Sequence, residues 1–164
     1  MIALHVLATD DWVLWRRLRL AALGDAPYAF GSRLADWQGA GDREQRWRDR
    51  LALPGSLNLV ATLAGEPAGM VSGVPTAPER DEVEVISLWV SPLARGRGVG
   101  DALLAAVVDW ARDIGAESVR LSVADGNSAA ASLYRRHGFV AAPELDQPMP
   151  DGIRAERGMR LQLR

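Results

Sequence analysis

The segment Val90-Ser91-Pro92-Leu93-Ala94-Arg95-Gly96-Arg97-Gly98-Val99-Gly100 joins an apolar, β-branched run to a long helical pattern. Its three glycines stand at alternate positions, just where the helix must begin. The backbone N–H groups of a first helical turn have no partner inside the helix, and they carry the positive end of its dipole. Since glycine leaves these groups open to an approaching anion, the segment predicts a phosphate-binding turn.

The composition is that of an ordinary globular protein. The chain has 164 residues, of which 48% are hydrophobic and 24% are charged, and we expect residues 1–164 to form a single domain. The formal net charge of −2 gives no reason to expect a nucleic acid as partner. We also expect no membrane segment, and the first residues do not resemble a signal peptide, which favours a cytoplasmic protein.

Several kinds of site are disfavoured by what the chain lacks. It has no cysteine and only two histidines, so we expect no metal and no thiolate catalysis. A dinucleotide-binding G-x-G-x-x-G motif that starts at Gly96 would need glycine where Asp101 stands. A P-loop needs a lysine, which the sequence does not contain. A nicotinamide-binding domain is therefore disfavoured.

Strand and helix patterns follow one another in an order that predicts a mixed sheet. A first strand and two helices precede three strands joined by short turns, and such strands pair antiparallel. A strand-helix-strand crossover follows, which makes a parallel pair. We therefore expect an α/β (α+β) fold, a mixed sheet of about six or seven strands with helices on both faces. The expected strands are 2–7, 57–63, 67–74, 82–90, 118–123, one that begins at 139, and 159–163, and the expected helices are 12–23, 43–52, 99–114 and 128–137.

Asn127 and Tyr134 are seven residues apart at the last expected helix, so they lie on nearly one stripe, two turns from each other. The small side chains of Ala130 and Ala131 between them leave a groove along that stripe. A groove of this kind, with an amide at one end and a phenol at the other, suits a slender ligand that carries amide groups. Each residue also has a structural explanation, Asn127 as a helix cap and Tyr134 as a partly buried tyrosine.

These residues resemble a known family. The sequence resembles the GCN5-related N-acetyltransferase (GNAT) superfamily, whose acetyl-CoA signature is Gln/Arg-x-x-Gly-x-Gly/Ala. The matching residues are Leu88-Trp89-Val90-Ser91-Pro92, Arg95-x-x-Gly98-x-Gly100, Asn127, Ala131, Leu133-Tyr134 and Gly138-Phe139. The resemblance covers about residues 82–140. It implies a splayed central sheet, acetyl-CoA as the acyl donor, and transfer of acetyl to a primary amine of a small molecule or peptide by direct attack in a ternary complex.

The resemblance also implies roles for individual residues. Residues 95–100 would hold the CoA pyrophosphate on main-chain N–H groups, and the pantetheine arm would lie between strands 82–90 and 118–123. Asn127 would hydrogen-bond this arm, and Tyr134 would stand near the sulfur as general acid. The expected cofactor-binding residues are Leu88, Trp89, Val90, Arg95, Gly96, Arg97, Gly98, Val99, Gly100, Asp101, Asn127, Ala130 and Tyr134.

An alkylammonium acceptor must lose a proton before it attacks, so the reaction needs a base or a water chain that leads to one. Glu84 is the candidate base, because its position matches the catalytic glutamate of the histone-acetylating branch of the family. Strict alternation along the strand would place it on the same face as Leu88 and Val90. The alternative is a glutamate that is exposed or paired with an arginine.

The sequence leaves the acceptor open. In the resembling family the ends of the chain shape the acceptor pocket, and aromatic residues of the irregular segment after the first helix would form one of its walls. Acids in the expected loop 143–158 either attract a cationic amine or are simply solvated. The aromatic candidates are Tyr28, Phe30 and Trp37, and the acids are Glu144, Asp146, Asp151 and Glu156.

A second class of function fits the same fold. A catalytically silent acyl-CoA-binding or sensing module would need the glycine turn but no phenol beside the sulfur, so Tyr134 separates it from an enzyme. The resemblance also allows a homodimer, since members of the family frequently form one.

Overall fold

The order of the elements agrees with the order expected from the sequence. The computed structural model describes all residues except 27–32, 80 and 150–151. Its described strands form one sheet in the order β1-β2-β3-β4-β5-β8-β6, with β7 paired to β8. The elements are β1 (Ile2–Val6), α1 (Trp12–Asp25), α2 (Glu44–Leu51), β2 (Leu57–Leu63), β3 (Glu66–Pro75), β4 (Glu82–Val90), α3 (Val99–Asp113), β5 (Ser118–Ala124), α4 (Ser128–Arg136), β6 (Val140–Ala141), β7 (Gln147–Pro148) and β8 (Ala155–Gln162), with 3-10 turns η1 (Thr9–Asp11), η3 (Leu34–Trp37), η4 (Gly39–Gly41), η5 (Pro92–Ala94) and η6 (Pro143–Leu145).

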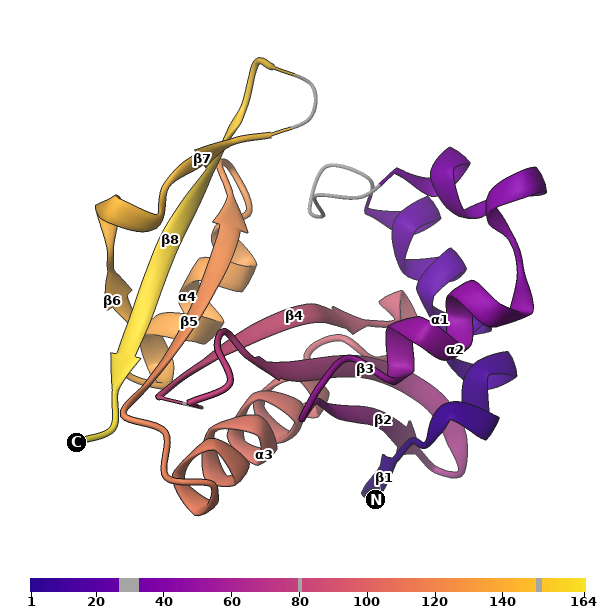
Figure 1. Ribbon diagram of the computed structural model, residues 1–164, viewed down its shortest axis with the longest axis horizontal. Coiled ribbons are helices and arrows are strands. Elements are labelled where there is room, and N and C mark those ends of the chain that lie inside the picture. The colour runs from indigo at the N-terminus through magenta and orange to yellow at the C-terminus, as the bar shows by residue number, and fades with distance from the viewer. Residues whose placement is uncertain (27–32, 80, 150–151) are drawn as a thin grey trace.

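The sheet is mixed and carries helices on both faces, as expected. Strands β1 to β4 pair antiparallel in sequence order, β4 and β5 pair parallel, and β5 pairs antiparallel with β8. Helices α3 and α4 pack on one face, whereas α1 and α2 pack on the other (Figure 1). Within the described part of the chain, no helix has the length and apolar character needed to cross a membrane.

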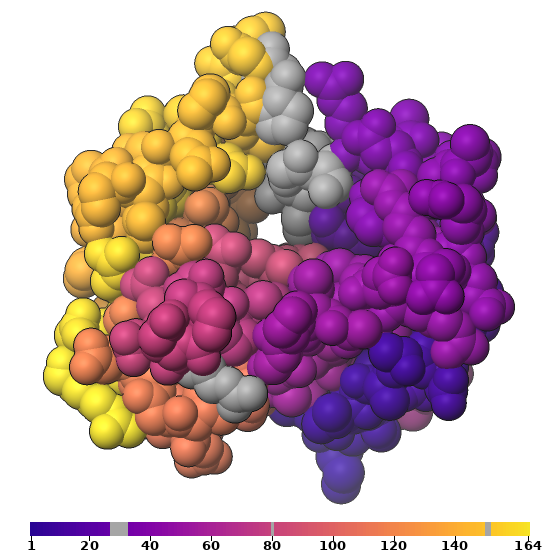
Figure 2. All heavy atoms as spheres, viewed as in Figure 1, coloured from indigo at the N-terminus to yellow at the C-terminus, as the bar shows by residue number. Residues whose placement is uncertain are grey.

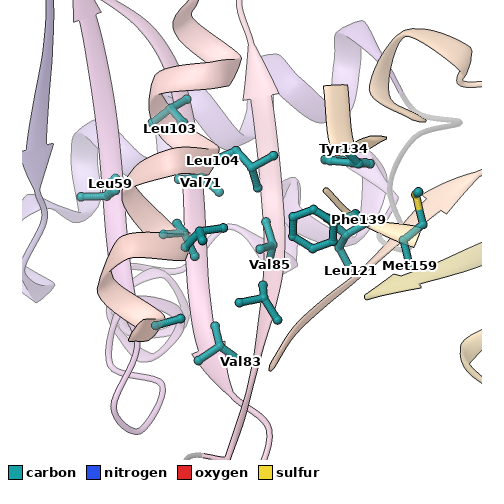
Figure 3. Packing of buried hydrophobic residues seen from close by; sticks show 14 of the residues in the cluster. Leu59, Val71, Val83, Val85, Leu103, Leu104, Leu121, Tyr134, Phe139 and Met159 are labelled. Atoms are coloured by element: carbon teal, nitrogen blue, oxygen red, sulfur yellow. The ribbon is translucent and has the colours of Figure 1, made fainter. Parts of the chain in front are cut away.

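Two hydrophobic cores hold the sheet between these helices. In the larger core, Leu103 and Leu104 of α3 pack against Val71 and Val85 of the sheet (Figure 3). Each fully buried aliphatic side chain of this kind contributes about 1.5–3 kcal/mol to folding. Strand β4 contributes to both cores, so its position is fixed from two sides. The smaller core, on the opposite face, contains Leu7, Trp15, Leu18, Ala22, Trp47, Leu51, Val60, Met70 and Trp89.

Strands β4 and β5 separate soon after they begin. They pair only from Glu82–Ser118 to Glu84–Arg120, although β4 continues to Val90. Figure 1 shows the two strands turning away from each other beyond this point. Beyond the last pair, the facing edges of the two strands have no strand partner among the described residues. Because backbone N–H and C=O groups need hydrogen-bond partners, these edges are suited to an extended ligand.

Strand β4 contains a bulge opposite β3. The pairing register moves from Ser72–Ile86 to Met70–Trp89, so β4 has one more residue than β3 between these pairs. Ser87 takes up the additional residue with a φ of 59°, in the left-handed region that residues other than glycine rarely adopt. A bulge of this kind bends a strand and exchanges its two faces from that residue onward.

The bulge corrects one expectation about Glu84. Val83 and Val85 belong to the core beneath α3, so Glu84 between them points to the opposite face of the sheet. Leu88 and Val90, which follow the bulge, pack against the α3 core instead. The expectation that Glu84 shares a face with Leu88 and Val90 is therefore wrong, because alternation is interrupted between them.

The C-terminal part of the chain contains more strand than expected. The segment 143–158, expected to be a loop, includes β7 and the first half of β8, which pairs with β5 as far as Ala124–Glu156. The first residues of β8 lack apolar alternation. They are held by strand pairing and by Arg157, which binds Asp125 at 2.8 Å and Asp146 at 3.2 Å. A hydrophobic pattern could not predict this strand for that reason.

Candidate active site

The glycine turn presents a row of backbone donors at the start of α3. Gly96 and Gly98 have φ values of 76° and 86°, which residues with a Cβ rarely adopt, and Gly98 is the N-cap of the helix. Among the described residues, no backbone carbonyl accepts a hydrogen bond from the N–H groups of residues 96–101. The first such bond runs from Ala102 N to Gly98 O, at 3.0 Å. The turn therefore has the donors and the helix dipole that an anion site requires.

These donors border a cavity of about 540 Å³ that extends from the turn, past the end of β4, to α4. Arg97 is exposed and does not line the cavity, in contrast to the other expected cofactor positions. The expected residues that line it are Leu88, Trp89, Val90, Arg95, Gly96, Gly98, Val99, Gly100, Asp101, Asn127, Ala130 and Tyr134.

The side chain of Arg95 binds other parts of the protein. Its Nε donates to the carbonyl of Val90 at 3.1 Å, and its guanidinium pairs with Asp25 at the end of α1. Asp25 also accepts a hydrogen bond from the indole N–H of Trp89 at 3.0 Å. The Trp89 indole and the Arg95 guanidinium together hold the pKa of Asp25 below its usual value. Arg95 thus fastens the turn to α1, and the hydrogen-bond donors that the turn offers to an anion are main-chain N–H groups.

Asp101 joins the first turn of α3 to the end of α4. Its carboxylate lies 2.9 Å from Nε2 of His137 and 3.1 Å from a guanidinium nitrogen of Arg136. The hydrogen bond with His137, and then the one with Arg136, lower the pKa of Asp101. Its negative charge, although close to the glycine turn, is therefore offset by neighbouring donors.

Asn127 and Tyr134 both line the cavity from α4. The Asn127 side chain accepts a hydrogen bond from Ala130 N at 3.3 Å, so it caps the helix, and the capping explanation is correct whatever else it binds. Tyr134 is 7% exposed, with its ring centroid 6.1 Å from that of Phe139. Burial raises the pKa of Tyr134 to about 12, so its hydroxyl stays protonated at neutral pH.

A second cavity, of about 510 Å³, lies on the α1 and α2 side of the separated strands. Figure 2 shows this face hollowed between the N-terminal helices, in indigo and purple, and the C-terminal strands, in orange and yellow. Leu88, Asn127, Ala130 and Tyr134 line both cavities, so the two meet at these residues. The anion turn is thereby connected to a second binding space through the gap between β4 and β5.

The second cavity contains charged residues from several elements. Glu84 lines it and lies 3.4 Å from Arg120. Glu156 of β8 also lines it, and burial together with the charge of Glu84 raises the pKa of Glu156. Trp37 is part of its wall. Tyr28, Phe30 and Asp151 lie outside the described residues, whereas Glu144 binds Arg160 and Asp146 binds Arg157.

Sequence reasoning missed two arginines of this cavity, Arg19 of α1 and Arg50 of α2. Arg19 had a detectable signal, because it lies four residues after Trp15 and three before Ala22, on the buried stripe of α1. A charged residue on such a stripe is rarely buried without a purpose. Arg50 had no comparable signal, because its partners come from three strands distant in the sequence.

The cavity at the glycine turn and the second, charged cavity meet at Leu88, Asn127, Ala130 and Tyr134, so the structure has room for two ligands side by side. The model of the Acetyltransferase (GNAT) family matches residues 17–139, and the chain belongs to this family.

Among curated relatives, the mycothiol acetyltransferase of Salinispora tropica is 34% identical over 140 residues, covering 81% of this chain and 42% of the relative. The chain thus spans less than half the length of that relative. The L-methionine sulfoximine/L-methionine sulfone acetyltransferase of Pseudomonas aeruginosa is 36% identical over 107 residues, covering 63% of this chain and 62% of the relative. YncA of Salmonella typhimurium, solved with its cofactor acetyl-CoA, is 24% identical with a TM-score of 0.77, covering 100% of this chain and 95% of the other. This structural likeness shows a shared fold.

Replacing Asp101 with Asn should lower the free energy of unfolding at pH 7 by about 0.5–1 kcal/mol, the usual range for a partly exposed ion pair. A carboxylate whose pKa falls on folding stabilises the protein above its unfolded pKa, and this effect is lost as the pH falls through the folded pKa. The difference between wild type and variant should therefore shrink below about pH 4. Denaturant unfolding of both proteins, at pH 7 and below about pH 4, measures this difference in the free energy of unfolding.

Asp109→Asn, at an exposed position of the same helix, is the matched control and should change little. A stability difference for Asp101→Asn that persists unchanged in acid would show that Asp101 acts through its shape and hydrogen bonds alone.

Proposed function

We propose that the chain transfers the acetyl group of acetyl-CoA to a primary amine of a small molecule or peptide, by direct attack in a ternary complex. The observation that carries this proposal is the meeting of the two cavities at Tyr134, between an anion turn and a space that can hold an acceptor. Membership of the GNAT family supports acetyl transfer, and the acetyl-CoA bound to YncA supports the identity of the donor.

The donor would bind along the first cavity. Its pyrophosphate accepts hydrogen bonds from the N–H groups of residues 96–101 and lies at the positive end of α3. Its pantetheine arm pairs with the unpartnered edge of β4, near Leu88 and Val90, and hydrogen-bonds the amide of Asn127. The thioester then lies beside Tyr134, where the two cavities meet.

In the reaction, the amine nitrogen attacks the thioester carbon, a C–N bond forms, and the C–S bond breaks to release CoA as a thiolate. Glu84 takes the proton that the nitrogen loses, directly or through water. The pKa of Tyr134, about 12, lies above that of a thiol, about 8.5. Tyr134 therefore keeps most of its proton and shares it with the sulfur in a hydrogen bond as charge develops. The departing thiolate is protonated by solvent, to which Glu84 returns the proton taken from the amine. No covalent intermediate with the protein is needed.

Tyr134→Phe should lower turnover by about 10²–10⁴-fold, because it removes the only proposed proton donor at the sulfur. Acetyl-CoA should bind the variant as tightly as the wild type, since the ring and its packing remain. Release of free CoA in the presence of a panel of amines measures turnover, and calorimetry measures binding.

If the wild-type protein binds acetyl-CoA but none of the amines leads to release of CoA, the chain is a silent binding module. Unchanged turnover of Tyr134→Phe would remove the phenol from the mechanism.

Gly98→Glu should abolish the thermal stabilisation that acetyl-CoA gives, because a carboxylate at the turn blocks the N–H groups and repels phosphate. Gly65→Glu is the control, since Gly65 has a similar φ of 83° in the turn between β2 and β3, with no atom close to its position. The two variants share the same backbone strain, so only loss of binding in Gly98→Glu supports the cradle. Equal thermal shifts with acetyl-CoA would mean that the pyrophosphate binds elsewhere.

Glu84→Gln should lower kcat/KM at pH 7 by about 10²-fold, because the amine then lacks a base. The kcat/KM of the variant should recover as the pH approaches the pKa of the amine, near about 10, where the amine is already deprotonated. The pH–rate profile of CoA release measures the shift. Glu156→Gln provides the comparison, because Glu156 lines the same cavity. A shift in Glu156→Gln and none in Glu84→Gln would assign the base to Glu156.

A further inference from the structure

Arg50 places a guanidinium in the second cavity, and the hydrogen-bond acceptors that it has among the described residues are neutral. Its Nη2 donates to Ser72 Oγ at 3.0 Å and to Ser87 Oγ at 3.1 Å, and its Nη1 donates to Asn58 Oδ1 at 3.3 Å. No carboxylate of the described residues forms an ion pair with it. These bonds use three of the five N–H groups of a guanidinium, and the described residues leave the N–H of Nε and one N–H of Nη1 for a ligand.

The acceptors of Arg50 are themselves fixed. Ser72 and Asn58 are 0% and 2% exposed, and Ser72 donates to Asn58 Oδ1 at 2.6 Å. The amide of Asn58 donates in turn to the carbonyl of Leu51, at 3.2 Å. The Arg50 guanidinium carbon also lies 5.1 Å from the ring centroid of Trp15. The guanidinium is thus held in one orientation before any ligand binds, as a specific binding site requires.

The positive charge of this region is larger than that of Arg50 alone. Arg19 lines the same cavity and is 8% exposed. Burial and the charge of Arg19 lower the pKa of Arg50 to about 10, and burial lowers the pKa of Arg19 to about 10. Both side chains remain charged at neutral pH. A bound anion would interact favourably with the Arg50 guanidinium, whereas a cationic group would be repelled.

The opposite charge lies elsewhere in the cavity. Glu84 of β4 and Glu156 of β8 line it, and the charge of Glu84 raises the pKa of Glu156, so the two carboxylates are close enough to interact. Arg120 is offset by Glu82 at 3.6 Å and by Glu84 at 3.4 Å. The cavity therefore has cations on the α1 and α2 side and acids on the strand side. A ligand with an amine and an anionic group complements both.

Building on the proposed function, we propose that the acceptor is an amino carboxylic acid and that Arg50 binds its carboxylate. The amino group then faces Glu84 and Glu156, near the junction of the cavities at Tyr134. Both N–H groups of Nη2 donate to the two serines, so the carboxylate would accept a charge-assisted hydrogen bond from Nε or Nη1, which is stronger than one between neutral groups. Arg50 is accordingly a specificity residue of the acceptor site.

The alternative is that Arg50 only braces α2 against the sheet. A bracing residue would affect every acceptor equally, whereas a carboxylate-binding residue would affect only acceptors that carry the carboxylate. The distinction is measurable with amino acids and their carboxamides, which have the same amine and side chain but differ in this one charge.

With wild-type protein, CoA release is measured for several α-amino acids and their carboxamides. We expect a KM about 10- to 100-fold lower for the acids, the range for a charge-assisted hydrogen bond. Arg50→Met should remove this preference by raising the KM of the acids more than that of the amides, and Arg50→Lys should retain part of the preference. Arg48→Met is the matched control, because Arg48 of the same helix binds Asp10 and Glu44 at the surface. It should keep the wild-type preference.

Equal KM values for acids and amides in the wild type would overturn the proposal, and this comparison needs no variant. Equal losses for both classes in Arg50→Met would show that Arg50 is a brace. If none of the amines leads to release of CoA, the proposed acetyl transfer is refuted. Each amino acid and its carboxamide are then compared by how much they raise the melting temperature of the complex with CoA. Stronger stabilisation by acids than by amides, lost in Arg50→Met, would still support the carboxylate site. Equal stabilisation would refute it.

Discussion

Strands β4 and β5 stop pairing after Glu84 and Arg120, and the whole site depends on this separation. Two parallel strands that remained paired would leave no passage between the faces of the sheet. The separation is held from both sides, because α3 packs beneath β4 while β8 pairs with β5 along its full length. The fold therefore keeps two strand edges without partners, and a ligand that runs between them would satisfy hydrogen-bonding groups that the sheet leaves open.

The bulge at Ser87 adapts β4 to this arrangement. Before it, Val85 packs under α3 and Glu84 faces the second cavity, and after it Val90 packs under α3 and Trp89 joins the core of α1 and α2. One strand thereby contributes to both cores and to both cavities. The hydroxyl of Ser87 is also an acceptor for Arg50, so the residue that bends the strand helps to position a cation in the cavity.

Local signals predicted the donor half of the site, and distant contacts explain why the other half was missed. The glycine turn and the stripe of Asn127 and Tyr134 each lie within one short segment, so their spacing could predict that they line one cavity. The second cavity is assembled from α1, α2, β4, β5 and β8, and no short segment contains its pattern. The bulge was missed because strict alternation offers no sign of an inserted residue, and β8 was underestimated because ion pairs hold its first residues in place of apolar alternation.

The two halves of the site also differ in how they tolerate genetic change. The glycine turn offers main-chain N–H groups to an anion, and every residue type except proline supplies one. Substitutions there preserve the donors as long as Gly96 and Gly98 keep their backbone conformation. The second cavity is made of side chains, so single substitutions alter its charge and shape directly. A lineage of such proteins can therefore acquire new acceptors by mutation in α1, α2 or β8 while its donor stays the same.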